Sequence, residues 1–193
     1  MKLSISLVTL AAASAFAGSS FALTSQEARA EKDRIAAEYK AAKNQCKSLS
    51  GNAKDVCQEE AKGNEKVAKA ELHAREKPSA EHQYKARATR ADADYEVAKE
   101  KCDDQSGNAK DVCKKDAKAA HVTALENAKV AKAAAQPGQP ATEKAAHVAE
   151  ARKDAAAEKN EANYKAAAER CDALAGDAKD KCVADAKRDF HQK

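Results

Sequence analysis

Three copies of one cysteine motif constrain this chain most. The motif reads Cys-x4-Gly-[Asn/Asp]-Ala-Lys-Asp-x-Cys, and a tyrosine precedes its first cysteine by seven residues each time. The three copies contain all six cysteines of the chain, so we assign the cysteines to the architecture. The copies and their tyrosines are Cys46 to Cys57 with Tyr39, Cys102 to Cys113 with Tyr95, and Cys171 to Cys182 with Tyr164.

Each motif is symmetric about its Gly-Asn or Gly-Asp step, and this predicts a helical hairpin. We expect the glycine to end one helix in a left-handed conformation. The next residue would be the N-cap of the following helix, with an aspartate at position N3. The predicted turn residues are Gly51, Asn52, Gly107, Asn108, Gly176 and Asp177, and the N3 residues are Asp55, Asp111 and Asp180.

Cysteines equidistant from such a turn face one another. Packed helix axes lie about 8–10 Å apart and each Cα lies about 2.3 Å from its axis, which leaves roughly 3.4–5.4 Å between facing Cα atoms. This range overlaps the separation that a disulfide requires. Zinc-binding thiolates usually stand closer in sequence than these pairs do. We therefore predict the local disulfides Cys46–Cys57, Cys102–Cys113 and Cys171–Cys182.

Helix-forming residues dominate the rest of the chain, with alanine, lysine and glutamate throughout. Apolar residues recur at steps of three and four, which is typical of a heptad-like, coiled-coil seam. In the first arm these are Ile35, Tyr39, Ala42, Cys46 and Leu49. Thr24 and Glu27 form a predicted capping box. The fold class is therefore all-α: three disulfide-stapled αα-hairpins, elongated or loosely bundled.

Proline and glycine divide the chain into segments. Pro78 separates the first two hairpins, and Gln136 to Pro140 has the composition of a linker. Thr142 is the expected N-cap of the helix that follows. The predicted organisation is a signal peptide at 1–22, hairpins at 23–77 and 78–135, a linker at 136–141 and a third hairpin at 142–193. The repeats are unevenly spaced, so a strict solenoid is not expected.

The N-terminus resembles a cleavable export signal. A charged start, Met1-Lys2, precedes an apolar stretch from Leu3 to Ala17, and Ser20-Phe21-Ala22 offers small residues for cleavage. A cut after Ala17 is the alternative. A membrane anchor is less consistent, because a span needs about 20 apolar residues. We expect a periplasmic protein with no membrane span after cleavage, in which disulfides form readily.

The apolar core should be small. Beyond the signal segment the chain has 14 Ile, Leu and Val residues and five Tyr and Phe. Small cores need staples, and each short disulfide loop contributes on the order of 3 kcal/mol. We expect Tyr39, Tyr95 and Tyr164 to be core residues above their disulfides, with a ligand groove lined by aromatic rings as the alternative.

Composition favours neither catalysis nor nucleic-acid binding. The 35 basic and 31 acidic residues are interleaved, and no aromatic stacking platform accompanies them. No Cys-x-x-Cys, phosphate loop or nucleophile motif is present in the sequence. We therefore expect no enzyme activity and no cofactor. The histidines are predicted to be isolated surface residues, although a metal site built from separate helices stays open; they are His73, His82, His121, His147 and His191.

Several blocks resemble a family of small exported Ala/Lys-rich proteins of β-proteobacteria, which are sometimes labelled TolA-like cell-envelope proteins. The blocks are Tyr39 to Lys43, Ser50 to Cys57 and Tyr95 to Cys102. The resemblance implies a role in the cell envelope. TolA itself keeps a membrane anchor and a globular terminal domain, whereas this chain has a cleavable-looking signal and ends in a hairpin.

Two hypotheses for function follow. The first is a non-enzymatic periplasmic structural or interaction protein that acts through helical surfaces, with an envelope protein or a second copy as partner. The second is a binding module that sequesters a small ligand, metal or haem between hairpins.

Overall fold

The structure, a computed structural model, describes residues 23–193, and the predicted signal peptide at 1–22 lies outside them. Within residues 23–193 all regular structure is helical, so the all-α prediction is confirmed. Hairpin 1 consists of α1 and α2, hairpin 2 of α3 and α4, and hairpin 3 of α5 and α6. The helices are α1 Ser25–Cys46, α2 Gly51–Glu76, α3 Ala80–Cys102, α4 Gly107–Ala135, α5 Ala141–Cys171 and α6 Gly176–Asp189.

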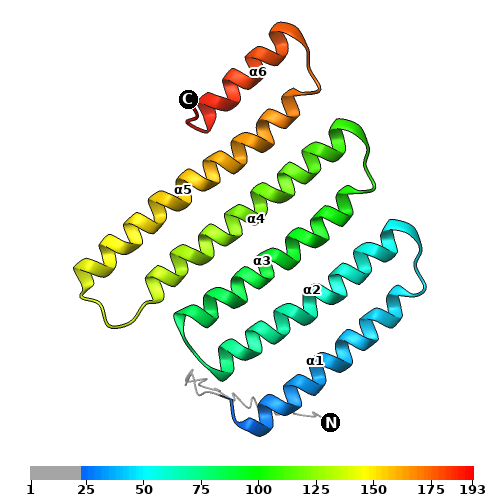
Figure 1. The fold of residues 1–193 in the computed structure, drawn as a ribbon, viewed down its shortest axis with the longest axis vertical. Coiled ribbons are helices and arrows are strands. Elements are labelled where there is room, and N and C mark those ends of the chain that lie inside the picture. Colours follow the sequence, from blue (N-terminus) through cyan, green and yellow to red (C-terminus); the bar gives the residue numbers. More distant parts are fainter. Residues whose placement is uncertain (1–22) are drawn as a thin grey trace, which may run out of the picture.

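The six helices lie side by side in a single antiparallel layer (Figure 1). In the described part of the chain, helix contacts join only consecutive helices, from α1·α2 to α5·α6. The three motif turns lie along one edge of the layer, and the α2–α3 and α4–α5 connections lie along the opposite edge. Among residues 23–193 no helix covers either broad face, so both faces of the inner helices are open with respect to these residues.

All three predicted disulfides are present and close their hairpins. The bonds are Cys46–Cys57, Cys102–Cys113 and Cys171–Cys182, with Cα atoms 5.6, 5.6 and 5.7 Å apart. These separations slightly exceed the range expected from ideal helix packing. The first cysteine of each pair ends its helix and is almost fully buried. The stapled-hairpin prediction is therefore confirmed.

The details of the turn differ from the prediction. The motif glycines are left-handed, with φ of +55°, +57° and +55°, but each begins the second helix and does not end the first. The first arm stops at its cysteine, and four residues then reverse the chain. The residues in the N-cap position are Ser50, Ser106 and Ala175, and none forms a side-chain cap hydrogen bond. The interpretation of Asn52, Asn108 and Asp177 as N-caps is therefore wrong.

Two of these residues instead join neighbouring hairpins. The Asn52 side-chain amide donates a hydrogen bond to the Glu100 carbonyl at the end of α3, at 2.9 Å. Asn108 donates in the same way to the Glu169 carbonyl at the end of α5, at 3.0 Å. Both accepting residues stand two positions before a motif cysteine. The amide after the motif glycine thus fixes how one hairpin sits against the next.

Capping at the other boundaries follows the sequence only in part. Thr24 and Glu27 form the predicted capping box at the start of α1. Ser79 accepts a hydrogen bond from the His82 amide and caps α3. Thr142 is not an N-cap, because α5 already begins at Ala141 and Pro140 takes the cap position. The linker accordingly ends one residue earlier than the predicted 136–141.

Alanine makes up most of the core. Large residues that are buried are few, chiefly Ile35, Val67 and Leu72. Between α2 and α3, Gly63 permits a close approach: a Cβ at this position would lie 3.0 Å from the Ala93 Cβ. Leu49, which the heptad pattern placed in the seam, is 41% exposed because α1 ends at Cys46, before the residue is reached.

Candidate functional site

Hairpins 1 and 2 together form a hollow on one face of the layer. It has a volume of about 630 Å³ and extends from α1 across α2 to α3. Four arginines line it: Arg34 from α1, Arg75 from α2, and Arg87 and Arg90 from α3. We call this hollow the arginine groove.

Helical periodicity places these side chains on one side of the layer. On α2, Ala68, Glu71 and Arg75 follow one another at steps of three and four, so they form a single ridge. On α3, Gln83, Arg87 and Arg90 repeat the same steps. The groove is thus built from the open face of three neighbouring helices.

Small apolar side chains separate the charged ones. Ala68 and Ala74 come from α2 and Ala86 comes from α3. Ala86 is buried, and the other two are half-buried. Because these methyl groups are short, the long arginine side chains stand above them and leave room between.

A carboxylate holds two of the guanidinium groups in place. Glu31 accepts hydrogen bonds from Arg34 Nε at 2.8 Å and Nη2 at 2.7 Å, and from Arg75 Nη2 at 2.6 Å. These bonds, first that of Arg34 and then that of Arg75, lower the pKa of Glu31 to about 2. Since Arg34 belongs to α1 and Arg75 to α2, the carboxylate also fastens the two helices together.

A second ion pair fastens α2 to α3. Arg90 Nη2 donates to Glu71 Oε1 at 2.8 Å. Arg87, one turn away, is exposed and forms no ion pair within residues 23–193. The groove therefore combines three ion pairs, two to Glu31 and one to Glu71, with a cation that has no ion-pair partner in the described chain.

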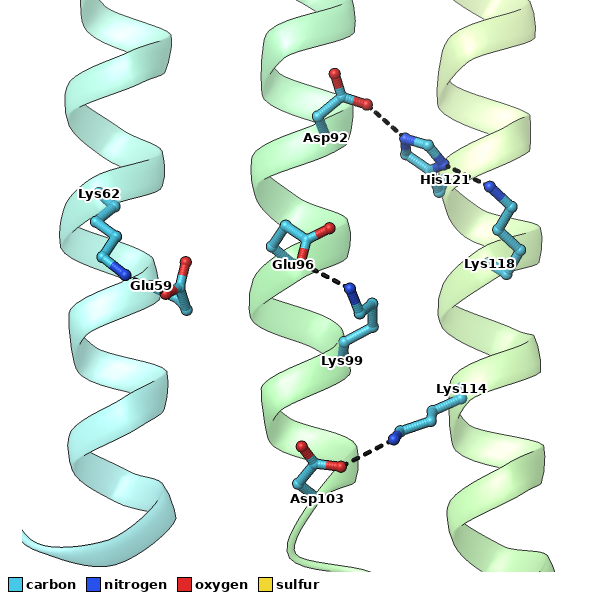
Figure 2. A network of polar contacts seen from close by, with 9 residues as sticks. All are labelled: Glu59, Lys62, Asp92, Glu96, Lys99, Asp103, Lys114, Lys118 and His121. Atoms are coloured by element: carbon cyan, nitrogen blue, oxygen red, sulfur yellow. Dashed lines mark hydrogen bonds and ion pairs between the residues drawn. The ribbon is translucent and has the colours of Figure 1, made fainter.

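The opposite face of the same helices carries lysines. Nine positions separate Lys62 from Glu71 and Lys66 from Arg75, which is two and a half helical turns, so the members of each pair point to opposite sides of α2. Figure 2 shows this lysine face, where Lys62 pairs with Glu59, Lys99 with Glu96 and Lys114 with Asp103. The Lys62–Glu59 pair lies within α2 and the Lys99–Glu96 pair lies within α3. Exposed pairs of this kind contribute little to stability.

An aromatic cluster lies between α3 and α4. His121 and Tyr95 are stacked with ring centroids 4.7 Å apart, and His121 Nε2 lies 2.7 Å from Asp92 Oδ1. The ammonium groups of Lys99 and Lys118 lie 5.1 and 5.3 Å from the Tyr95 ring centroid. The side chain of His121 is only 9% exposed, so the expectation of an isolated surface histidine is wrong here.

Two further histidines also meet. The rings of His73 and His82 lie edge to face with centroids 4.4 Å apart, beside the α2–α3 connection. Residues 23–193 contain no group of three His, Cys, Asp or Glu side chains placed to hold a metal ion.

The prediction that the motif tyrosines are core residues is wrong. Tyr39, Tyr95 and Tyr164 are all half-buried. Tyr39 lines a hollow between α1 and α2, and the Lys43 ammonium lies 5.2 Å from its ring centroid. In a one-layer array the space between two helices opens to solvent on both sides. A phenol there keeps its apolar ring against the helices and one side in water.

The groove residues were not found by sequence analysis because three helices supply them. One signal was available: arginine is rare in this lysine-rich chain, yet Arg75, Arg87 and Arg90 occur within sixteen residues. The joining role of Asn52 and Asn108 was also missed. The sequence did offer a signal for this role. The motif glycine is the same in all three copies, whereas the residue after it changes to Asp177 in the third copy.

Comparisons of the chain with protein-family models, with curated proteins and with solved structures found no significant match. In the described residues, no helix is both long enough and apolar enough to cross a membrane.

Proposed function

We propose that this chain is a non-enzymatic structural or interaction protein of the bacterial periplasm that acts through its helical faces. The observation that carries the proposal is the single layer formed by residues 23–193, within which only consecutive helices touch. A layer of this kind offers far more open helical surface than a bundle of equal length. Such surface suits recognition of a partner by helix faces.

The disulfides support an exported location. Stable disulfides form in oxidising compartments, and all six cysteines of this chain are paired. The periplasm, the signal peptide at 1–22 and kinship with the exported Ala/Lys-rich family are parts of the proposal. The same pairing leaves no thiol free to act as a nucleophile, which supports a role without catalysis.

The partner is an envelope protein or a second copy of this chain. The interleaved charges of the lysine face do not favour nucleic acid, which selects continuous basic surfaces. Short intrahelical pairs such as Lys62–Glu59 leave this face nearly neutral.

Site-specific photocrosslinking in the native host tests the proposal. A photoreactive residue would replace Glu71 on the arginine-groove face or Lys62 on the lysine face. The matched control replaces Gln105 in a motif turn at the edge of the layer. We expect a discrete protein adduct from at least one face position and none from Gln105. Equal labelling at all three positions would contradict recognition through the faces.

A second candidate function is favoured by one specific observation. The arginine groove crosses from hairpin 1 to hairpin 2 and is large enough for a small ligand. This is the place where a binding module formed between hairpins would hold its ligand.

A further inference from the structure

We propose that the arginine groove binds a small polyvalent oxyanion, with two or more phosphate or carboxylate groups on a compact body. This inference deepens the second candidate function and does not depend on the first. It rests on which cations line the groove, how many of their donors are unused and how much room they enclose.

The cations that line the groove itself are all arginines. The chain has 27 lysines and eight arginines, and four of the eight arginines line this one hollow. The lysine face uses Lys62, Lys66 and Lys99 at comparable positions on α2 and α3. Arginine differs from lysine in its planar fork of donors, which matches the paired oxygens of a carboxylate or a phosphate. Net charge alone would not require arginine here.

Most of the donors in the groove are unused. A guanidinium carries five N–H donors. Arg75 gives one nitrogen to Glu31, Arg90 gives one to Glu71, and Arg87 gives none to an ion pair within residues 23–193. The side chains of Arg75 and Arg90 are 53% and 52% exposed, so the remaining donors are accessible.

The groove is also electrostatically suited to an anion. Its lining contains four guanidinium groups and two carboxylates, and Glu38 pairs with Arg34 from outside the lining, which leaves one positive charge in excess. The ion pairs with Glu31 and Glu71 order the side chains of Arg75 on α2 and Arg90 on α3 before any ligand binds. A ligand therefore does not bear the whole entropy cost of ordering these long side chains.

The volume of the groove and the alanines at its base restrict the size and shape of the ligand. A volume of about 630 Å³ lies within the range of small-molecule sites. The methyl groups of Ala68, Ala74 and Ala86 offer a floor without competing polar atoms. A compact ligand can rest its hydrocarbon part on this floor and direct its acid groups to the guanidinium groups.

Calorimetric titration of the oxidised protein with pyrophosphate and with citrate tests the proposal and distinguishes the two acid types. Acetate serves as the monovalent control. We expect saturable binding of at least one polyvalent probe and much weaker binding of acetate. The variant Arg75→Gln/Arg87→Gln should bind about tenfold more weakly or worse, since it removes charged hydrogen bonds.

The matched control is Lys62→Gln/Lys66→Gln, which removes the same charge from the lysine face. It should bind like the parent protein. Arg87→Gln alone keeps every ion pair of the groove, so it tests the site even if the double variant folds poorly. Arg87→Lys keeps the charge but loses the fork, and we expect it to bind more weakly than the parent.

Absence of binding by both probes would overturn the proposal, as would equal losses in the arginine and lysine variants. Either result would leave the interaction role untouched, because photocrosslinking measures that role separately. Conversely, a photocrosslinking failure would not affect binding measured with purified protein.

Discussion

Hairpins 1 and 2 differ from hairpin 3 at the residue after the motif glycine. Asn52 and Asn108 each donate a hydrogen bond to a carbonyl of the following hairpin. In hairpin 3 the position holds Asp177, whose side chain has no N–H group to donate. The disulfide staple is common to all three copies, whereas the joining amide is present in the first two.

The length of the second helix also distinguishes hairpin 3 from hairpins 1 and 2. The second arms α2 and α4 have 26 and 29 residues, whereas α6 has 14 and covers only part of α5 (Figure 1). A short helix is marginal without packing. Hairpin 3 should therefore depend on its staple more than the other hairpins do.

The largest effect should come from removing staples. Replacing Cys171 and Cys182 by alanine should cost on the order of 3 kcal/mol locally. Amide exchange of α6 should then approach that of an unfolded segment while α2 and α4 stay protected. The matching change at Cys102 and Cys113 should instead loosen hairpin 2 and lower the melting temperature of the array. Equal exchange of α6 in both variants would remove the distinction between hairpin 3 and the hairpins with longer second arms.

The next largest loss of stability should come from overpacking the contact between α2 and α3. Gly63→Leu should cost roughly 1–3 kcal/mol, because even a Cβ would lie 3.0 Å from the Ala93 Cβ. Chemical denaturation measures the loss. Lys66→Leu, one turn away on the exposed lysine face, is the control and should change stability little. An unchanged free energy of unfolding in Gly63→Leu would mean that Gly63 does not pack closely against Ala93.

Loss of the joining amides should have a smaller effect. Asn52→Ala or Asn108→Ala should cost about 1 kcal/mol, which is typical of one hydrogen bond. Asp177→Ala is the matched control and should stay within about 0.5 kcal/mol of the parent. Equilibrium unfolding of the three variants checks this. If Asp177→Ala were as destabilising as the two asparagine variants, the residue would have a structural role within hairpin 3 itself.

The smallest effect concerns pH and hairpin 1. Arg34 and Arg75 hold the pKa of Glu31 at about 2, below its ordinary value of 4.5. A lowered pKa stabilises the fold above pH 4.5, and this contribution is lost as pH falls from 4.5 towards about 2. Denaturant unfolding across this range should show a steeper acid loss for the parent than for Glu31→Gln. Parallel curves would indicate that the ion pairs contribute nothing to stability.

Sequence analysis predicted the disulfides that close the hairpins but not the arginines that line the groove between them. The symmetric spacing of Cys46 and Cys57 was sufficient to predict their bond, since a short hairpin brings only equidistant residues together. Arg34 and Arg90 are separated by two connections, and they line one hollow because α1 and α3 lie on either side of α2. No local pattern specifies that placement.

Local chemistry determined the elements of this protein. Motif spacing, helix propensity and the breakers at Pro78 and Pro137 fix where helices form and which cysteines pair, because these features depend on residues close together in the sequence. Only tertiary packing decided that the hairpins lie in one layer, that Asn52 bonds the next hairpin, and that Tyr39 stays half-exposed. The physical reason is that alanine-rich helices have several nearly equivalent seams. Non-local contacts such as Gly63 against Ala93 select among them.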